Sequence, residues 1–94
     1  MKKLIRDKVA IDYPDWDYKS ADDEEFFNLL IDKMSEELLE FKKTPTKEEL
    51  ADMLEIIHQL AHIQNISLED LESERKKKET SKGNFSKRLI WETK

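Results

Sequence analysis

The sequence predicts an all-α protein in which an antiparallel helical hairpin and a third helix assemble into an oligomeric helical bundle. The 94 residues include one glycine and two prolines, too few turn-forming residues for an all-β fold. Apolar residues recur three or four positions apart in the middle of the chain, which is the period of an amphipathic helix. A chain of this length forms one domain, residues 1–94, and buries a modest core, so a partner subunit is expected.

Residues 1–19 are expected to form an irregular lead. Pro14 lies there among aspartates and aromatic residues, a composition that favours turns over a regular helix. The aromatic side chains have two interpretations, stacking on a nucleotide base or fastening the lead to the core. They are Tyr13, Trp16 and Tyr18.

The first helix of the hairpin is expected over residues 21–42. Ser20 followed by a run of acids marks its start, because acidic side chains complement the helix dipole. Thr44 and Pro45 stop it, since the residue before a proline disfavours the helical conformation. Its predicted apolar stripe consists of Phe27, Leu30, Met34, Leu38 and Phe41.

The second helix is expected over residues 47–64. Thr46 with Glu49 three residues later has the form of a capping box. The apolar residues of this helix cover about half of its circumference at about 100° per residue. That arc is wider than one contact within a small chain requires, so a second burial surface is inferred, most simply in a homodimer or homotetramer. The apolar set is Leu50, Met53, Leu54, Ile56, Ile57, Leu60, Ala61 and Ile63.

A third helix is expected over residues 68–82, opened by a second capping box of Ser67 and Asp70. It is mostly charged, so it is marginal alone and is expected to pack at the edge of the molecule. Gly83 is the expected C-cap, and residues 83–94 form a tail, either a short strand or an extended arm. The apolar residues of the tail are Leu89, Ile90 and Trp91.

Charge is distributed unevenly along the chain. From Asp12 to Glu55 there are 15 acids against 5 lysines and arginines, whereas from Arg75 to Lys94 there are 2 acids against 8. An acidic middle repels phosphates, so nucleic-acid binding is not expected. A divalent cation with a small polyanion would suit this distribution, and the alternative is an uneven scatter of charge without function.

Several classes are excluded by what the sequence lacks. The absence of cysteine excludes a disulfide framework and any cysteine-ligated metal. No apolar run is long enough for a signal peptide or a membrane span, so no membrane partner is expected. The protein is expected to be cytoplasmic.

Two pairs of acids carry the candidate chemistry. Glu37 and Glu40 in the first helix, and Glu49 and Asp52 in the second, are each three residues apart and so share a helix face. A short connection makes the two helices antiparallel neighbours, so the end of the first faces the start of the second. Four converging carboxylates repel one another unless a cation joins them, and Mg²⁺, with Mn²⁺ as an alternative, prefers such oxygen ligands.

A purely structural interpretation of these acids stays open. Glu49 is also placed to act only as the capping partner of Thr46. The three glutamates of the first helix could form a solvated face that pairs with lysines. Those residues are Glu36, Glu37 and Glu40, with Lys33 and Lys43.

The chain resembles the MazG-like all-α nucleoside triphosphate pyrophosphohydrolases. EELLE at 36–40 followed by EELAD at 48–52 is similar to the EExxE…ExxD signature of that superfamily. KLIRDKV at 3–9 and ERKKKETSKGNF at 74–85 are similar to the lead and the R-x-x-K…GGF segment of its short phosphoribosyl-ATP pyrophosphohydrolase-like branch. Two features depart from that pattern, Asn84 in place of the second glycine and no proline after the lead.

The resemblance implies an oligomeric helical enzyme that cleaves a nucleotide between its α- and β-phosphates to give a monophosphate and pyrophosphate. It implies that Glu37, Glu40, Glu49 and Asp52 hold Mg²⁺, and that Glu36 orients the attacking water. Such chemistry needs a metal rather than a protein nucleophile. The alternatives are a non-catalytic helical oligomer that binds nucleotide or a protein partner, and action on phosphoribosyl-ATP.

Basic residues near both ends are candidates for holding the substrate's phosphates. Three of them share a face of the third helix at spacings of three and seven, and two more lie in the lead. A solvated basic face paired with Glu72, Glu74 and Glu79 is the alternative. The candidates are Arg75, Lys78, Lys82, Arg6 and Lys8.

Overall fold

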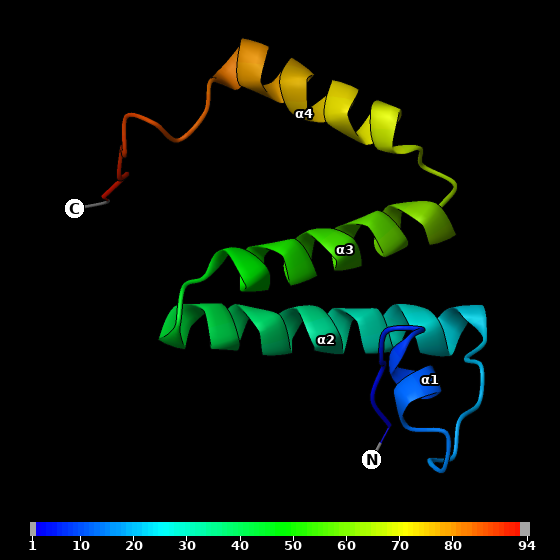
Figure 1. Ribbon diagram of the computed structural model, residues 1–94. Coiled ribbons are helices and arrows are strands. Elements are labelled where there is room, and N and C mark those ends of the chain that lie inside the picture. Colours follow the sequence, from blue (N-terminus) through cyan, green and yellow to red (C-terminus); the bar gives the residue numbers. More distant parts are fainter. Residues whose placement is uncertain (1, 93–94) are drawn as a thin grey trace.

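The computed structural model describes residues 2–92, and within that range it is all helical, with no strand. The all-α expectation is therefore confirmed. The chain passes through a one-turn helix, two long helices that pack side by side, and a fourth helix that stands apart (Figure 1). The elements are α1 (Val9–Asp12), α2 (Asp23–Lys43), α3 (Lys47–Ile63) and α4 (Leu68–Lys82).

Helices α2 and α3 form the predicted antiparallel hairpin (Figure 1). Asp22, not Ser20, caps α2, because its Oδ1 accepts a hydrogen bond of 2.8 Å from the backbone N–H of Glu25. At the start of α3, Thr46 Oγ1 accepts from the backbone N–H of Glu49 at 3.2 Å, which confirms the predicted cap. These caps fix where each helix begins and hence which side chains face across the hairpin.

The core is small and lies mostly between α2 and α3. Its buried apolar residues are Leu30, Ile56 and Ala61. The predicted stripe on α2 is partly wrong, because Phe27 and Leu38 remain 41% and 53% exposed. The face of α2 that packs against α3 contains Leu30 and Glu37, the two buried residues of this helix. The carboxylate of Glu37 therefore lies in the core.

The lead is irregular except for α1, a single turn that the sequence analysis did not predict. Tyr13 and Trp16 stack on each other with ring centroids 4.4 Å apart, and the Tyr18 hydroxyl donates to the Tyr13 carbonyl. All three side chains are about half exposed. The stack and the hydrogen bond that the structure shows for them lie within the lead itself.

Helix α4 has the predicted bounds and caps. Ser67 Oγ accepts from the backbone N–H of Asp70 at 3.1 Å, and Gly83 ends the helix with a φ of 81°, a conformation that favours glycine. The helix lies on the side of α3 away from α2, and none of its residues, all of which the structure describes, is buried (Figure 1). The tail up to residue 92 is extended and contains no strand, with Leu89, Ile90 and Trp91 exposed.

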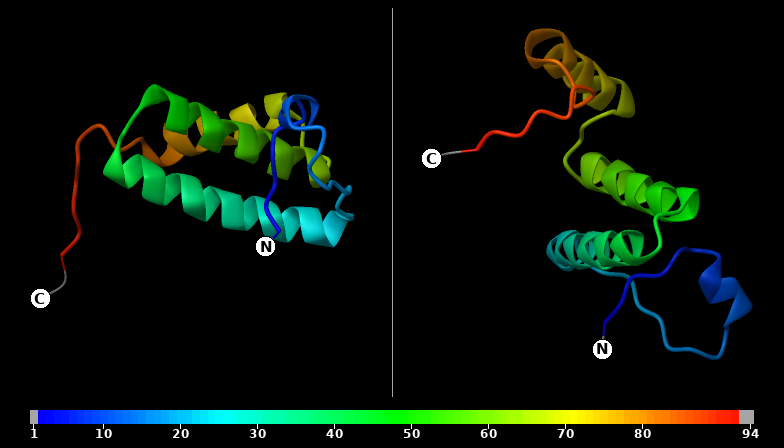
Figure 2. Two further views of the ribbon diagram at one scale, coloured as in Figure 1. Left: turned by 60° about the horizontal axis from the view of Figure 1, so that its bottom comes forward. Right: turned by 90° about the vertical axis from the view of Figure 1, so that its left-hand side faces the viewer.

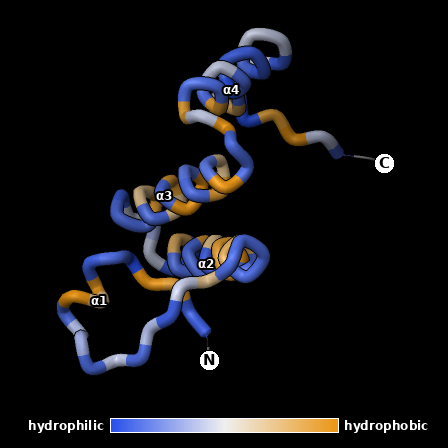
Figure 3. Tube along the Cα trace, turned by 90° about the vertical axis from the view of Figure 1, so that its right-hand side faces the viewer, coloured by the Kyte–Doolittle hydropathy of each residue, from blue (hydrophilic) through white to orange (hydrophobic). Residues whose placement is uncertain are grey.

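The molecule is extended rather than compact. Its radius of gyration is 17.0 Å, against about 12 Å for a compact domain of this length. The lead lies on one side of the hairpin and the tail extends on the other (Figures 2 and 3). Within residues 2–92, no helix combines the length and apolar character needed to cross a membrane.

Candidate metal centre

Three carboxylates from the two hairpin helices meet at one place. Glu37 comes from α2, and Glu49 and Asp52 come from the first turns of α3. One oxygen of each lies within 4.8 Å of the others. The arrangement follows from where α3 begins. The Thr46 side chain accepts a hydrogen bond from the backbone N–H of Glu49 and so fixes the first turn, and Asp52 follows three residues later on the same face.

The cluster is partly shielded from water, and its carboxylates lie close to one another. Glu37 is only 7% exposed, and Glu49 Oε2 is buried without a hydrogen-bond partner among the described residues. The pKa of Glu49 is raised to about 7, chiefly because neutral Glu49 can donate a hydrogen bond to the Glu37 carboxylate, whereas ionised Glu49 cannot. Shielding from water and repulsion from Glu37, Asp52 and Glu40 act in the same direction.

The donor set fits a small divalent cation. Oxygens bound to one octahedral Mg²⁺ stand about 3 Å apart when adjacent and about 4.2 Å apart when opposite. The three carboxylate oxygens already lie within 4.8 Å, so small side-chain movements would bring them to those separations. A cation would also give the buried Glu49 Oε2 the partner that residues 2–92 do not supply. Glu37, Glu49 and Asp52 are therefore the residues that could hold it.

Three basic side chains surround these acids. Lys33 Nζ lies 3.5 Å from Glu37 Oε1 and 3.7 Å from Glu36 Oε1. Lys3 Nζ lies 3.1 Å from the same Glu36 oxygen, and Arg6 Nη2 lies 2.7 Å from Asp52 Oδ1. The hydrogen bond from Lys3 and the nearby charge of Lys33 lower the pKa of Glu36.

A cavity of about 450 Å³ lies beside the carboxylates. Its wall is formed by the lead and by both hairpin helices, and it includes Glu37, Asp52, Lys33 and Arg6. The volume falls within the range of about 300–1,000 Å³ that small-molecule sites occupy. A larger hollow of about 820 Å³ is lined by α4 alone and is the open space beside that helix.

The structure brings some of the predicted site residues together and not others. Glu37, Glu49, Asp52, Glu36 and Arg6 gather at the cavity or beside it. Glu40 is exposed and acts on the pKa of Glu49 through its charge, but it lies outside the group of three that the described residues form. Lys8 is the exposed residue before α1.

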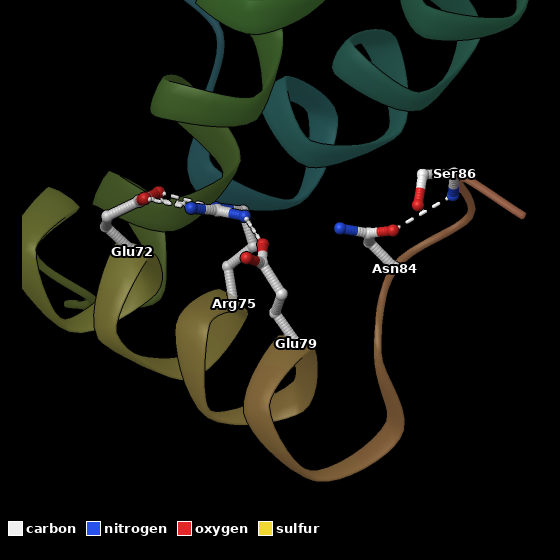
Figure 4. Close-up of polar contacts among 5 residues, drawn as sticks. All are labelled: Glu72, Arg75, Glu79, Asn84 and Ser86. Atoms are coloured by element: carbon white, nitrogen blue, oxygen red, sulfur yellow. Dashed lines mark hydrogen bonds and ion pairs between the residues drawn. The ribbon is translucent and has the colours of Figure 1, made fainter.

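The predicted phosphate residues of α4 do not reach the carboxylates within one chain. Arg75 instead bonds to Glu72 and Glu79 of its own helix, as the alternative interpretation of a paired basic face expects (Figure 4). Beyond the helix, the Asn84 side chain accepts from the backbone N–H of Ser86 (Figure 4). Lys78 and Lys82 lie on the same exposed helix, on the far side of α3 from α2.

Two residues beside the site, Lys33 and Lys3, were not predicted to belong to it. The sequence suggested Lys33 only as a partner of glutamates on the surface, although its spacing of three and four residues from Glu36 and Glu37 predicts these ion pairs. Lys3 lies 33 residues from Glu36 in the chain, and no local sequence pattern predicts a contact over that separation.

No family model, no curated protein and no solved structure matches this chain.

Proposed function

We propose that the protein is a Mg²⁺-dependent nucleoside triphosphate pyrophosphohydrolase. The observation that carries this proposal is the meeting of Glu37, Glu49 and Asp52 from two helices, with a buried carboxylate oxygen that has no partner in the described part of the chain. The resemblance of the EELLE and EELAD segments to the MazG-like signature supports the same function. The adjoining cavity offers room for a small ligand beside the carboxylates.

The residues divide the chemistry between them. Glu37, Glu49 and Asp52 would hold Mg²⁺, which would supply neutralisation of phosphate charge and polarisation of water. Glu40 is the proposed fourth acid of the site, and Glu36 orients the water. The water oxygen bonds to one phosphorus of the α–β anhydride, the bridging oxygen leaves on the other phosphate, and the released protons pass to solvent.

We also propose that the working form is a homodimer or homotetramer. Apolar side chains of both hairpin helices remain exposed in the single chain. The radius of gyration of 17.0 Å means that the single chain is extended, and an extended chain with exposed apolar residues supports burial against a second copy. The exposed apolar residues of the hairpin face are Phe27, Ile31, Leu38, Leu50, Leu54 and Ile57.

The test is pyrophosphate release from a panel of ribo-, deoxy- and modified nucleoside triphosphates and phosphoribosyl-ATP, with Mg²⁺ and with EDTA. We expect release only with the metal. A Glu37→Gln, Asp52→Asn double variant is expected to lose about 10²- to 10³-fold in kcat/KM, because the charge on the phosphates is no longer neutralised. The matched control is Asp32→Asn, Glu48→Gln, which removes the same charges from exposed positions of the same helices.

Two results would contradict this function. A double variant as active as the parent would mean that hydrolysis does not depend on the Glu37 and Asp52 carboxylates. Nucleotide binding by the folded protein without release of pyrophosphate would instead identify a non-catalytic nucleotide-binding oligomer. Preference for phosphoribosyl-ATP within the panel would keep the chemistry and change the substrate.

A further inference from the structure

The start of the chain is attached to the candidate metal centre by ion pairs. The basic segment, residues 2–8, crosses the hairpin helices on the side opposite the tail (Figures 2 and 3). Lys2 pairs with Glu25, Lys3 with Glu36, and Arg6 with Asp52. Two of these three contacts therefore involve acids assigned to the site.

Arg6 is paired with one of the carboxylates of that site. Its Nη2 lies 2.7 Å from Asp52 Oδ1, while Asp52 belongs to the group of carboxylates that could hold a metal. The charges of Asp52, Glu55 and Glu37 all favour the guanidinium there. The acid cluster of the isolated protein is thus partly neutralised by a side chain of the same protein.

A divalent cation and this guanidinium compete for Asp52. Both are positive, so they repel each other when they share one carboxylate. The Arg6 side chain is 62% exposed, so it can rotate into solvent or into the cavity without any movement of the helices. The residue also lines the cavity, where it would meet a ligand lying next to the carboxylates.

We propose that Arg6 exchanges partners during binding: it holds Asp52 in the metal-free protein, is displaced when the cation binds, and then contacts the substrate's phosphates. This proposal rests on the proposed function, because it assumes the metal and the phosphorylated ligand. Arg6 is therefore a positioning residue for Asp52 before binding and a ligand contact afterwards. The exchange makes metal affinity lower, and phosphate affinity higher, than the carboxylates alone would give.

The first test is calorimetric titration of the full chain with Mn²⁺ and with Mg²⁺ at low ionic strength. Arg6→Gln is expected to bind metal about 2- to 5-fold more tightly than the parent, the change that an exposed ion pair contributes. Lys2→Gln is the matched control, since it removes one charge and one ion pair from the same segment, at Glu25, and is expected to match the parent. The difference between Arg6→Gln and the parent is expected to shrink in high salt, because salt screens exposed charges.

The second test is nucleotide affinity, measured as Kd for a non-hydrolysable nucleoside triphosphate and as KM. Arg6→Gln is expected to weaken nucleotide binding while it tightens metal binding. A merely structural role for Arg6 would not move the two affinities in opposite directions. Metal affinity in Arg6→Gln that is equal to or weaker than that of the parent would overturn the exchange.

The outcomes separate this proposal from the proposed function. Tighter metal binding by Arg6→Gln, with no turnover of any nucleotide by the parent, would support the partner exchange and contradict the proposed hydrolase function. Metal-dependent turnover by the parent, with unchanged metal affinity in Arg6→Gln, would support the hydrolase function and contradict the exchange. A parent protein that binds no divalent cation would overturn both.

Discussion

Glu37 of α2 and Glu49 of α3 face each other across the hairpin with one carboxylate oxygen of each within 4.8 Å of the other, and this closeness raises the pKa of Glu49 to about 7. Glu37 is the buried carboxylate of the hairpin, and the Glu49 oxygen beside it is cut off from water. Two ionised carboxylates at this distance repel each other, and the cation of the proposed metal site would relieve that repulsion.

Stability of the metal-free protein should fall as the pH rises from about 4.5 to about 7. Glu49 has a pKa of about 7 in the folded chain against an ordinary value of 4.5, so the folded protein holds this proton more strongly. The contribution is complete below the unfolded value and is lost as the pH passes the folded one. The measurement is Tm in EDTA from pH 4.5 to pH 8. The lowered pKa of Glu36 acts in the opposite sense but below pH 4.5, outside this window.

The variant Glu49→Gln isolates this effect. At pH 8 it should be more stable than the parent in EDTA, because it removes a buried charge next to Glu37. At pH 4.5 the two proteins should have similar Tm values. Glu48→Gln, at an exposed neighbouring position, serves as the control and should follow the parent at every pH. A parent and a Glu49→Gln variant with parallel pH profiles would mean that no proton is held at this position.

Divalent cations should stabilise the parent against heat. A ligand that binds only the folded state adds about 2.7 kcal/mol at a concentration of 100 times Kd. In a domain of this size each kcal/mol raises Tm by roughly 4–8 °C. Differential scanning fluorimetry with Mg²⁺ or Mn²⁺ should show this rise for the parent and for Asp32→Asn, but not for the Glu37→Gln, Asp52→Asn variant. An equal rise in the double variant would place the cation elsewhere.

The cap at the start of α3 should support both the fold and the metal site. Thr46→Ala removes the acceptor for the Glu49 N–H and should cost about 1 kcal/mol, since caps of this kind contribute about that much. It should also weaken Mn²⁺ binding, because Glu49 lies in the first turn that the cap orders. Thr46→Ser keeps the hydroxyl and should restore both properties. Chemical denaturation and Mn²⁺ titration of the same samples measure them, and a Thr46→Ala protein with unchanged metal affinity would separate the cap from the site.

A charge placed on the exposed hairpin face should dissociate the oligomer. Ile31 and Leu54 are 43% and 53% exposed in the single chain, so burial against a second copy is the expected source of assembly. Light scattering during gel filtration should give a dimer or tetramer for the parent and a monomer for Ile31→Glu or Leu54→Glu. Ser73→Glu adds the same charge on α4 and should leave the mass unchanged. A parent that is monomeric at high concentration would contradict the assembly.

Much of the helical arrangement could be predicted from the sequence, because local chemistry determines it. The caps at Thr46 and Ser67 and the end at Gly83 follow from the hydrogen bonds and the positive φ that those residue types supply. The meeting of Glu37 with Glu49 and Asp52 follows from helix spacing and a short connection.

The rest depends on contacts between distant residues. Apolar periodicity centred the contact face of α2 on a stripe that includes Phe27, whereas the structure turns the face so that Glu37 is buried. A pattern based on hydrophobicity cannot choose that arrangement, because it excludes a charged residue from the core. The ion pair of Arg6 with Asp52 spans 46 residues and has no local signal.

The separation of α4 from the hairpin divides the chain into two regions that should open independently. Helix α4 buries none of its described residues, and it meets α3 but not α2. A charged helix of 15 residues is marginal on its own, so its amide hydrogens should exchange with deuterium far sooner than those around Leu30 and Ile56. Order in α4 then depends on what it touches, and slower exchange there would report the arrival of a neighbouring molecule even while the carboxylates remain unchanged.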